Sequence, residues 1–226
     1  WCCRGGWPSN LDVEDEFALE TPAEYVRSIL DVNIPKLGLN PEIMRVLMKA
    51  LAMNVAQTPT YETLMKDMSY GDEGVSISAP TLKRYVDELK SLYLIDDLEG
   101  WEPSLRAKSR VRTKPKRYFV DPSLPSALLG ATPAVLARDT QTLGDLFEVI
   151  LELVDGRWAA VEIKLSDLKV TEKNVDKLHA FKEKVCGNPL SQVREPEFMA
   201  FIVGRGDIAY RRDDGILVLP IATLGA

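Results

Sequence analysis

The chain has 226 residues, of which 46% are apolar and 27% charged, and its 28 Lys and Arg against 34 Asp and Glu give a formal net charge of −6. This ordinary globular composition excludes a disordered polyelectrolyte, a fibrous repeat and a disulfide-knotted mini-protein. Apolar stretches such as Ile216 to Ile221 are far shorter than the roughly 20 residues that cross a bilayer. We therefore expect one large domain or two small ones in a soluble, cytoplasmic protein with no membrane partner.

The first half of the sequence predicts helices in a known order. Residues 22–54 are expected to form two helices, the second capped by Asn40 and opened by Pro41. A short helix is expected over 58–68, and a third helix begins at 78–81 after a Gly-containing turn. This order is typical of a helix-turn-helix.

A basic run follows the third helix and a strand predicted over 92–98. Seven bases and no acid occur between Arg106 and Arg117. Six of the bases alternate with other residues and would share one face of an extended strand: Arg106, Lys108, Arg110, Arg112, Lys114 and Lys116. This pattern indicates the wing of a winged helix in contact with phosphates. A charged edge strand or a loop is the plain alternative.

The predicted outer face of the third helix adds Lys83 and Arg84 to the candidate nucleic-acid-binding residues. Asp87 and Glu88 lie on the same face and would repel phosphates. DNA is therefore an expected partner, but deep insertion of this helix into the major groove is not favoured.

The second half of the sequence changes to an α/β pattern. Asp155-Gly156 is a strong hairpin signal between two predicted strands. Strands are expected over 117–121, 149–154, 157–165, 197–204, 208–212 and 216–221, and helices over 122–129, 133–148 and 170–185. We expect an α+β protein with a helical winged-helix-like region over 1–116 and a mixed-sheet region over 117–226.

The residues available for chemistry are few. Three cysteines, two of them adjacent, favour a reducing compartment, and a single histidine, His179, makes a zinc or His-rich metal site close to excluded. The chain has no phosphate-cradling Gly-x4-Gly-Lys-Ser/Thr loop and hence no ATP site of that kind. Gly204-Arg205-Gly206 is interpreted as a turn. Catalysis would therefore rest on carboxylates and lysine.

The triplet Glu162-Ile163-Lys164 carries the chemical signal. Val161, Ile163 and Leu165 are expected to form the core side of a strand, which places Glu162 and Lys164 together on the opposite face. A metal-dependent phosphodiesterase needs a carboxylate that helps to hold Mg²⁺ and a lysine that orients water or neutralises charge on the phosphate. A surface salt pair is the plain alternative.

Several segments resemble a known family. The chain is similar to the C-terminal domain of unknown function, family 4143, that follows an AAA-type ATPase domain in many bacterial and archaeal proteins, and its second half resembles the core of the PD-(D/E)XK nuclease superfamily. The matching segments occur in the family's order at 4–8, 81–85, 109–124, 143–148, 155–165 and 210–224. The resemblance implies a winged-helix part, a nuclease-like part and an N-terminal ATPase domain as partner, which agrees with the cut-looking start of this chain.

The resemblance also implies a site. Glu162 and Lys164 would be catalytic, and Glu148 and Glu162 would bind Mg²⁺. Family members continue from the Leu-Phe-Glu that ends at Glu148 to a Glu-Val-Asp motif whose Asp is the first metal ligand, whereas here Val149 follows directly. Either the stretch is deleted or residues are omitted at this point, and we favour omission because the loss of a central strand would disrupt the sheet.

The expected function is therefore that of a nucleic-acid-binding, nuclease-like domain of an AAA-type ATPase, with Mg²⁺-dependent cleavage of phosphodiester bonds. The alternative is a non-catalytic module that binds protein or regulates the ATPase.

Overall fold

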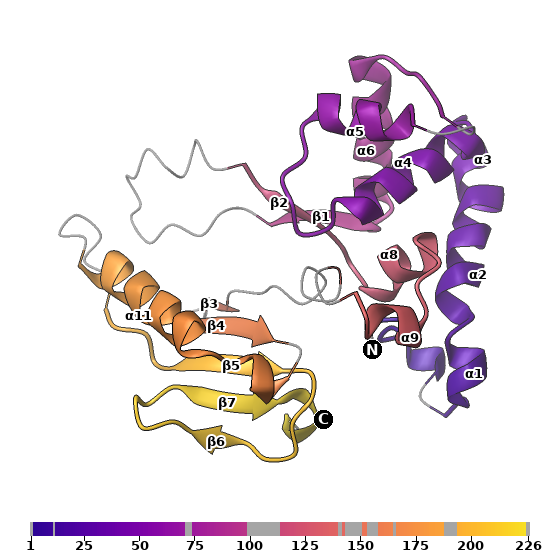
Figure 1. Ribbon diagram of the computed structural model, residues 1–226. Coiled ribbons are helices and arrows are strands. Elements are labelled where there is room, and N and C mark those ends of the chain that lie inside the picture. The colour runs from indigo at the N-terminus through magenta and orange to yellow at the C-terminus, as the bar shows by residue number, and fades with distance from the viewer. Residues whose placement is uncertain are drawn as a thin grey trace. The chain divides into compact units, whose positions relative to one another are not determined.

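The computed structural model (Figure 1) describes residues 2–10, 12–70, 74–98, 114–139, 142, 151–152, 158–164, 166–187 and 194–224. Helices and mixed sheets are both present, which confirms the α+β class. Within these ranges, no helix has the length and apolar character needed to cross a membrane.

The chain divides into two compact units. Unit 1 comprises Trp1–Glu99 and Lys114–Asp139, and unit 2 comprises Gly100–Thr113 and Thr140–Ala226. We expected the boundary after residue 116. Unit 1 extends further because the strand that begins at Lys116 pairs within it and Leu124 is part of its core.

The first helical segment of unit 1 contains a π turn. It comprises α1 (Asp15–Ala18), α2 (Thr21–Ser28), the π turn (Ile29–Asn33) and α3 (Ile34–Lys36). The N–H of Ile34 donates to the carbonyl of Ile29, five residues earlier. The next residue is Pro35, which has no N–H to donate, so the π turn lies where the regular α-helical ladder loses a donor.

The next three helices each begin after a capping side chain, and the first of these caps, Asn40, was predicted. These are α4 (Pro41–Met53), α5 (Tyr61–Met68) and α6 (Ala79–Ser91). Asn40 Oδ1 accepts from the N–H of Glu42 at 2.8 Å, Thr60 Oγ1 from Thr63 at 3.1 Å, and Ser78 Oγ from Thr81 at 3.3 Å. Because Thr60 is the cap, α5 begins at Tyr61 rather than at residue 58.

A hairpin completes the winged-helix arrangement. Strands β1 (Ile95–Leu98) and β2 (Lys116–Phe119) are antiparallel, with Ile95 opposite Phe119. The Ala56 N–H donates to the Arg117 carbonyl at 3.1 Å, and the Arg117 N–H donates to the Gln57 carbonyl at 3.1 Å. The segment between α4 and α5 therefore pairs with β2, and the order helix, paired segment, helix, helix, hairpin is that of a winged helix.

Two short helices close the core of unit 1. They are α8 (Ser123–Leu128) and α9 (Pro133–Leu136), and α8 packs against α2 and α4. The fully buried residues of this core include Leu30, Ile34, Met44, Leu47, Met48, Leu64, Met68, Leu82, Leu89 and Leu124. These residues come from the π turn to α8, and the same cluster includes Ile95 and Phe119 of the hairpin. The helices and the hairpin therefore share one hydrophobic core.

Unit 2 is a mixed sheet with one long helix. Its strands are β3 (Leu151–Glu152), β4 (Trp158–Lys164), β5 (Met199–Val203), β6 (Tyr210–Arg211) and β7 (Leu217–Pro220), in the order β3-β4-β5-β7-β6. The three central strands β4, β5 and β7 are parallel and point the same way in Figure 1, while β3 and β6 run antiparallel to their neighbours. Helix α11 (Glu172–Cys186) connects β4 to β5, and short 3-10 turns occupy Asp167–Lys169 and Ile221–Thr223.

The core of unit 2 corrects our expectation for β4. Trp158 and Ala160 pack with Val175 and Leu178 of α11 in the larger hydrophobic cluster, whereas Val161 belongs to a smaller cluster on the other face. Because side chains alternate along a strand, Glu162 and Lys164 share the face of Trp158 and Ala160. The two residues are thus on the helix-covered face, not on the face opposite the main core.

Candidate functional site

The predicted pair Glu162 and Lys164 comes together at the end of β4. Lys164 Nζ donates to Glu162 Oε1 at 2.5 Å, and the Lys164 and Glu162 side chains are 23% and 31% exposed. In the parallel register, the two residues lie beside the buried Phe201 and Val203 of β5. A charged pair therefore occupies the rim of the main core, partly open to solvent.

A magnesium ion needs more than this pair. Mg²⁺ is usually held by one or two carboxylates together with water and phosphate oxygens. In the described part of the chain, no three His, Cys, Asp or Glu residues are grouped so that they could hold a metal. The second predicted ligand, Glu148, and its junction with Val149 lie outside the described residues. The described side chains therefore supply Glu162 alone and do not complete a magnesium site.

The surroundings of the pair are formed by the carboxyl ends of the parallel strands. The Gly204 N–H donates to the Lys164 carbonyl at 2.9 Å, and the Asp167 N–H donates to the Arg205 carbonyl at 3.2 Å. Open α/β sheets bind their ligands at such an edge. Sequence reasoning interpreted Gly204 to Gly206 as a turn and missed that it lies beside Lys164. The sequence feature that could have indicated this position is that the turn directly follows a predicted strand, which could pair with β4.

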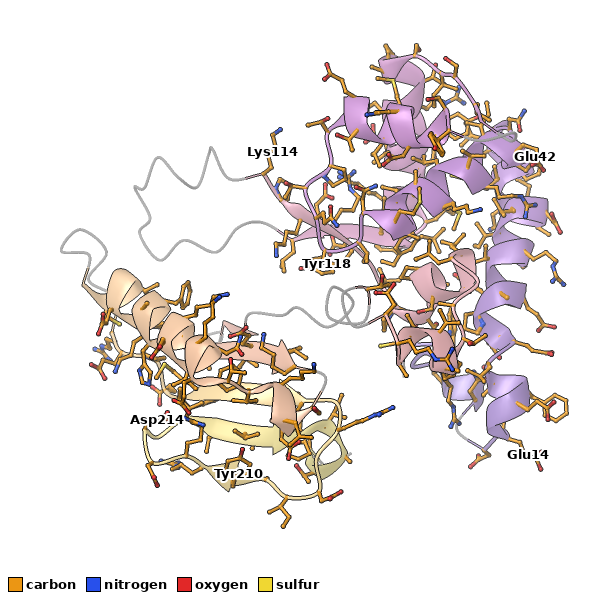
Figure 2. All side chains as sticks on the ribbon, viewed as in Figure 1. Glu14, Glu42, Lys114, Tyr118, Tyr210 and Asp214 are labelled. Atoms are coloured by element: carbon orange, nitrogen blue, oxygen red, sulfur yellow. The ribbon has the colours of Figure 1, made fainter. Side chains whose placement is uncertain are left out.

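The predicted basic residues of unit 1 are only partly described. Lys83 and Arg84 are exposed on α6, as expected, and Asp87 is exposed on the same helix. Lys114 precedes β2, and its exposed side chain points away from the hairpin (Figure 2). Lys116 lies on β2 and is half-buried. The remaining candidates, Arg106, Lys108, Arg110 and Arg112, lie outside the described residues.

The last base of the basic run has a structural contact instead. Arg117 Nε donates to Asp97 Oδ1 at 2.7 Å and Nη2 to Asp97 Oδ2 at 3.3 Å, and Lys90 of α6 binds the same carboxylate. Burial by itself would raise the pKa of Asp97, but hydrogen bonds from Arg117 and Lys90 hold it below its usual value. Asp97 thus joins β1 to both β2 and α6.

Comparison with known proteins identifies the first part of the chain. A family model described as Domain of unknown function (DUF8612) matches residues 1–135. The chain belongs to this family. The DUF8612 match ends inside unit 1, so α6 and the β1–β2 hairpin lie within it and the Glu162–Lys164 pair lies beyond it. Neither a curated protein nor a solved structure matches the chain.

Proposed function

We propose that the chain binds nucleic acid through unit 1 and carries a nuclease-like site in unit 2. The resemblance to family 4143 extends the proposal to a cytoplasmic domain that acts with an AAA-type ATPase domain. The observation that carries it is the Glu162–Lys164 pair at the carboxyl end of β4. Support comes from the order β3, β4, α11 and parallel β5, which is the order that the PD-(D/E)XK resemblance implies.

The catalytic part of the proposal is Mg²⁺-dependent cleavage of phosphodiester bonds. Lys164 supplies a positive charge for a phosphate oxygen, and Glu162 orients the Lys164 ammonium through their 2.5 Å hydrogen bond. In this proposal, Glu162 and Glu148 together bind the Mg²⁺ ion. Metal binding therefore depends on an acid outside the described residues.

Cleavage is tested with the purified chain, Mg²⁺ and both single-stranded and duplex DNA. Lys164→Ala and Glu162→Gln should each lower the rate at least about 100-fold, because each removes half of the charged pair. Lys177→Ala, which changes an exposed lysine of α11, should leave the rate unchanged. Equal rates in all variants, or no cleavage by the unmodified chain, would contradict a nuclease.

Binding through unit 1 is tested separately by titration with labelled duplex DNA at several salt concentrations. Replacing both Lys83 and Arg84 by Ala should weaken binding and lower the slope of log K against log salt by about 2, one for each phosphate contact. Asp87→Asn should strengthen binding, because it removes a negative charge from the same exposed helix face. Binding that is unaffected by both changes and by salt would remove α6 from the interface.

One observation favours the alternative, a non-catalytic module that binds protein or regulates the ATPase. Phe17 on α1 is 61% exposed, and Val13 and Leu19, which are near it in sequence, are each 37% exposed. Large exposed apolar side chains close together are typical of protein contacts. If neither DNA binding nor DNA cleavage is detected, the non-catalytic module replaces the nuclease as the proposed function.

A further inference from the structure

The turn after β5 is held rigidly against the end of β4. Its first two residues are bonded to the end of β4 and to the chain that follows it: the Gly204 N–H donates to the Lys164 carbonyl at 2.9 Å, and the Arg205 carbonyl accepts from the Asp167 N–H at 3.2 Å. A Cβ on Gly206 would lie 3.0 Å from Pro220 Cγ and 3.3 Å from a Val203 methyl, closer than side chains normally pack. The backbone of Arg205 is therefore fixed between a hydrogen bond and a tightly packed glycine.

The side chain of Arg205 is exposed and, within the described part of the chain, has no ion pair. Arg212 of the same unit differs, because it binds Glu172 at 2.9 Å and Asp214 at 3.0 Å. Arginine carries a planar fork of donors that fits a phosphate, and a fixed backbone lowers the entropy lost when the fork binds. Arg205 is thus a cation on a held backbone, with no ion-pair partner among the described residues.

Two of the most exposed apolar residues lie near Arg205 along the backbone. Leu168 is 88% exposed and follows Asp167, whose N–H binds the Arg205 carbonyl, and Ile208 is 73% exposed three residues after Arg205. A single exposed aliphatic residue needs no explanation. Two of them beside a fixed arginine, at the ligand-binding edge of a parallel sheet, provide the apolar surface on which a sugar or an unstacked base can rest.

We propose that Arg205 binds a backbone phosphate of a single nucleic-acid strand and that Leu168 contacts the adjacent nucleoside. The inference rests on the proposed nucleic-acid function but does not require cleavage. The same edge carries two acids, Asp167, whose N–H binds the Arg205 carbonyl, and Asp207, two residues after Arg205 in sequence. It therefore holds one phosphate rather than a series of them. This chemistry fits a single strand or a frayed end, whose bases are free to leave the stack.

The test is photo-crosslinking with the full chain. A benzophenone amino acid replaces Leu168, and the probe is a labelled single-stranded oligonucleotide in EDTA, so that no cleavage occurs. We expect a crosslink that falls at least about fivefold when Arg205→Gln is added. Arg211→Gln, which changes an exposed arginine of β6, is the matched control and should leave the yield unchanged. The same benzophenone amino acid in place of Ala180, which is exposed on α11, should give no crosslink.

Each result decides the proposal. No crosslink at position 168, or a yield that does not respond to Arg205→Gln, would overturn it. An equal fall with Arg211→Gln would also overturn it, since binding would then depend on general charge. Arg205→Gln alone could lower the crosslink yield while the unmodified chain and Lys164→Ala show no difference in DNA cleavage. The single-strand site would then stand, and only the catalytic proposal would fail.

Discussion

At the scale of single residues, the end of α6 is formed by a tyrosine where glycine is usual. Tyr93 has φ 55°. Its N–H donates to the Lys90 carbonyl at 2.9 Å, and the Leu94 N–H donates to the Leu89 carbonyl at 3.0 Å. This is a Schellman motif with tyrosine in the left-handed position. Because no glycine marks the end of the helix, the sequence predicted a strand from Leu92, whereas β1 begins only at Ile95.

Tyr93→Gly should stabilise the chain by about 0.5–1 kcal/mol. The left-handed conformation costs roughly 1–2 kcal/mol for a residue with a Cβ, part of which is offset by the greater freedom of glycine in the unfolded chain. Little packing is lost, since Tyr93 is 82% exposed. Urea unfolding measures the gain. Tyr93→Ala keeps the Cβ and serves as the control, and an equal gain from Ala would show that backbone strain is not the cause.

At the scale of elements, sequence reasoning succeeded where a local signal exists. The caps Asn40 and Ser78 were enough to place α4 and α6, because a capping side chain bonds to the backbone within three residues. The period of two along β4 likewise predicted that Glu162 and Lys164 share a face. It could not predict which face, because both faces of β4 are apolar.

The covered face of β4 depends on longer-range contacts. Helix α11 packs on the Trp158 side, and the parallel pairing of β5 with β4 brings Gly204 against Lys164. The contact between Lys164 and Gly204 joins residues 40 positions apart in sequence. The position of Arg205 beside the candidate site could therefore be found only in the folded sheet.

The contact between the hairpin and α6 predicts a pH dependence. Asp97→Asn should destabilise the chain by about 1–3 kcal/mol, because it leaves the Arg117 guanidinium half-buried without its carboxylate partner. The pKa of Asp97 is lowered in the folded state, so its stabilising effect is present above the unfolded-state pKa of about 4. That effect is lost as the pH falls through the lower, folded-state pKa.

Unfolding of both proteins across pH 2–7 measures this effect. The difference in stability between the unmodified chain and Asp97→Asn should be largest near neutral pH and shrink in acid. Asp96→Asn is the control, since Asp96 is exposed and, among the described residues, its carboxylate bonds only to the N–H of Asp97. A difference that stays constant down to pH 2 would show that the charge of Asp97 is not responsible.

At the scale of the whole molecule, the family match and the two units separate the two proposed activities. The DUF8612 region contains the helices and hairpin proposed to bind DNA. Strand β4, which carries Glu162 and Lys164, lies beyond this region in unit 2. In the described part of the chain, each unit has its own buried clusters, and the clusters share no residue. The boundary could not be predicted from composition, because β2 and α8 follow the basic run and still belong to the first core.

Separate cores predict that the two units unfold in separate steps. Leu47 is fully buried in unit 1 and Phe201 in unit 2, so Leu47→Ala should destabilise its unit by about 2–5 kcal/mol and Phe201→Ala by about 3–5 kcal/mol. In differential scanning calorimetry, each substitution should lower the temperature of one transition and leave the other in place. Because two-state behaviour belongs to a single cooperative domain, a single transition that shifts with both substitutions would mean that the units fold as one.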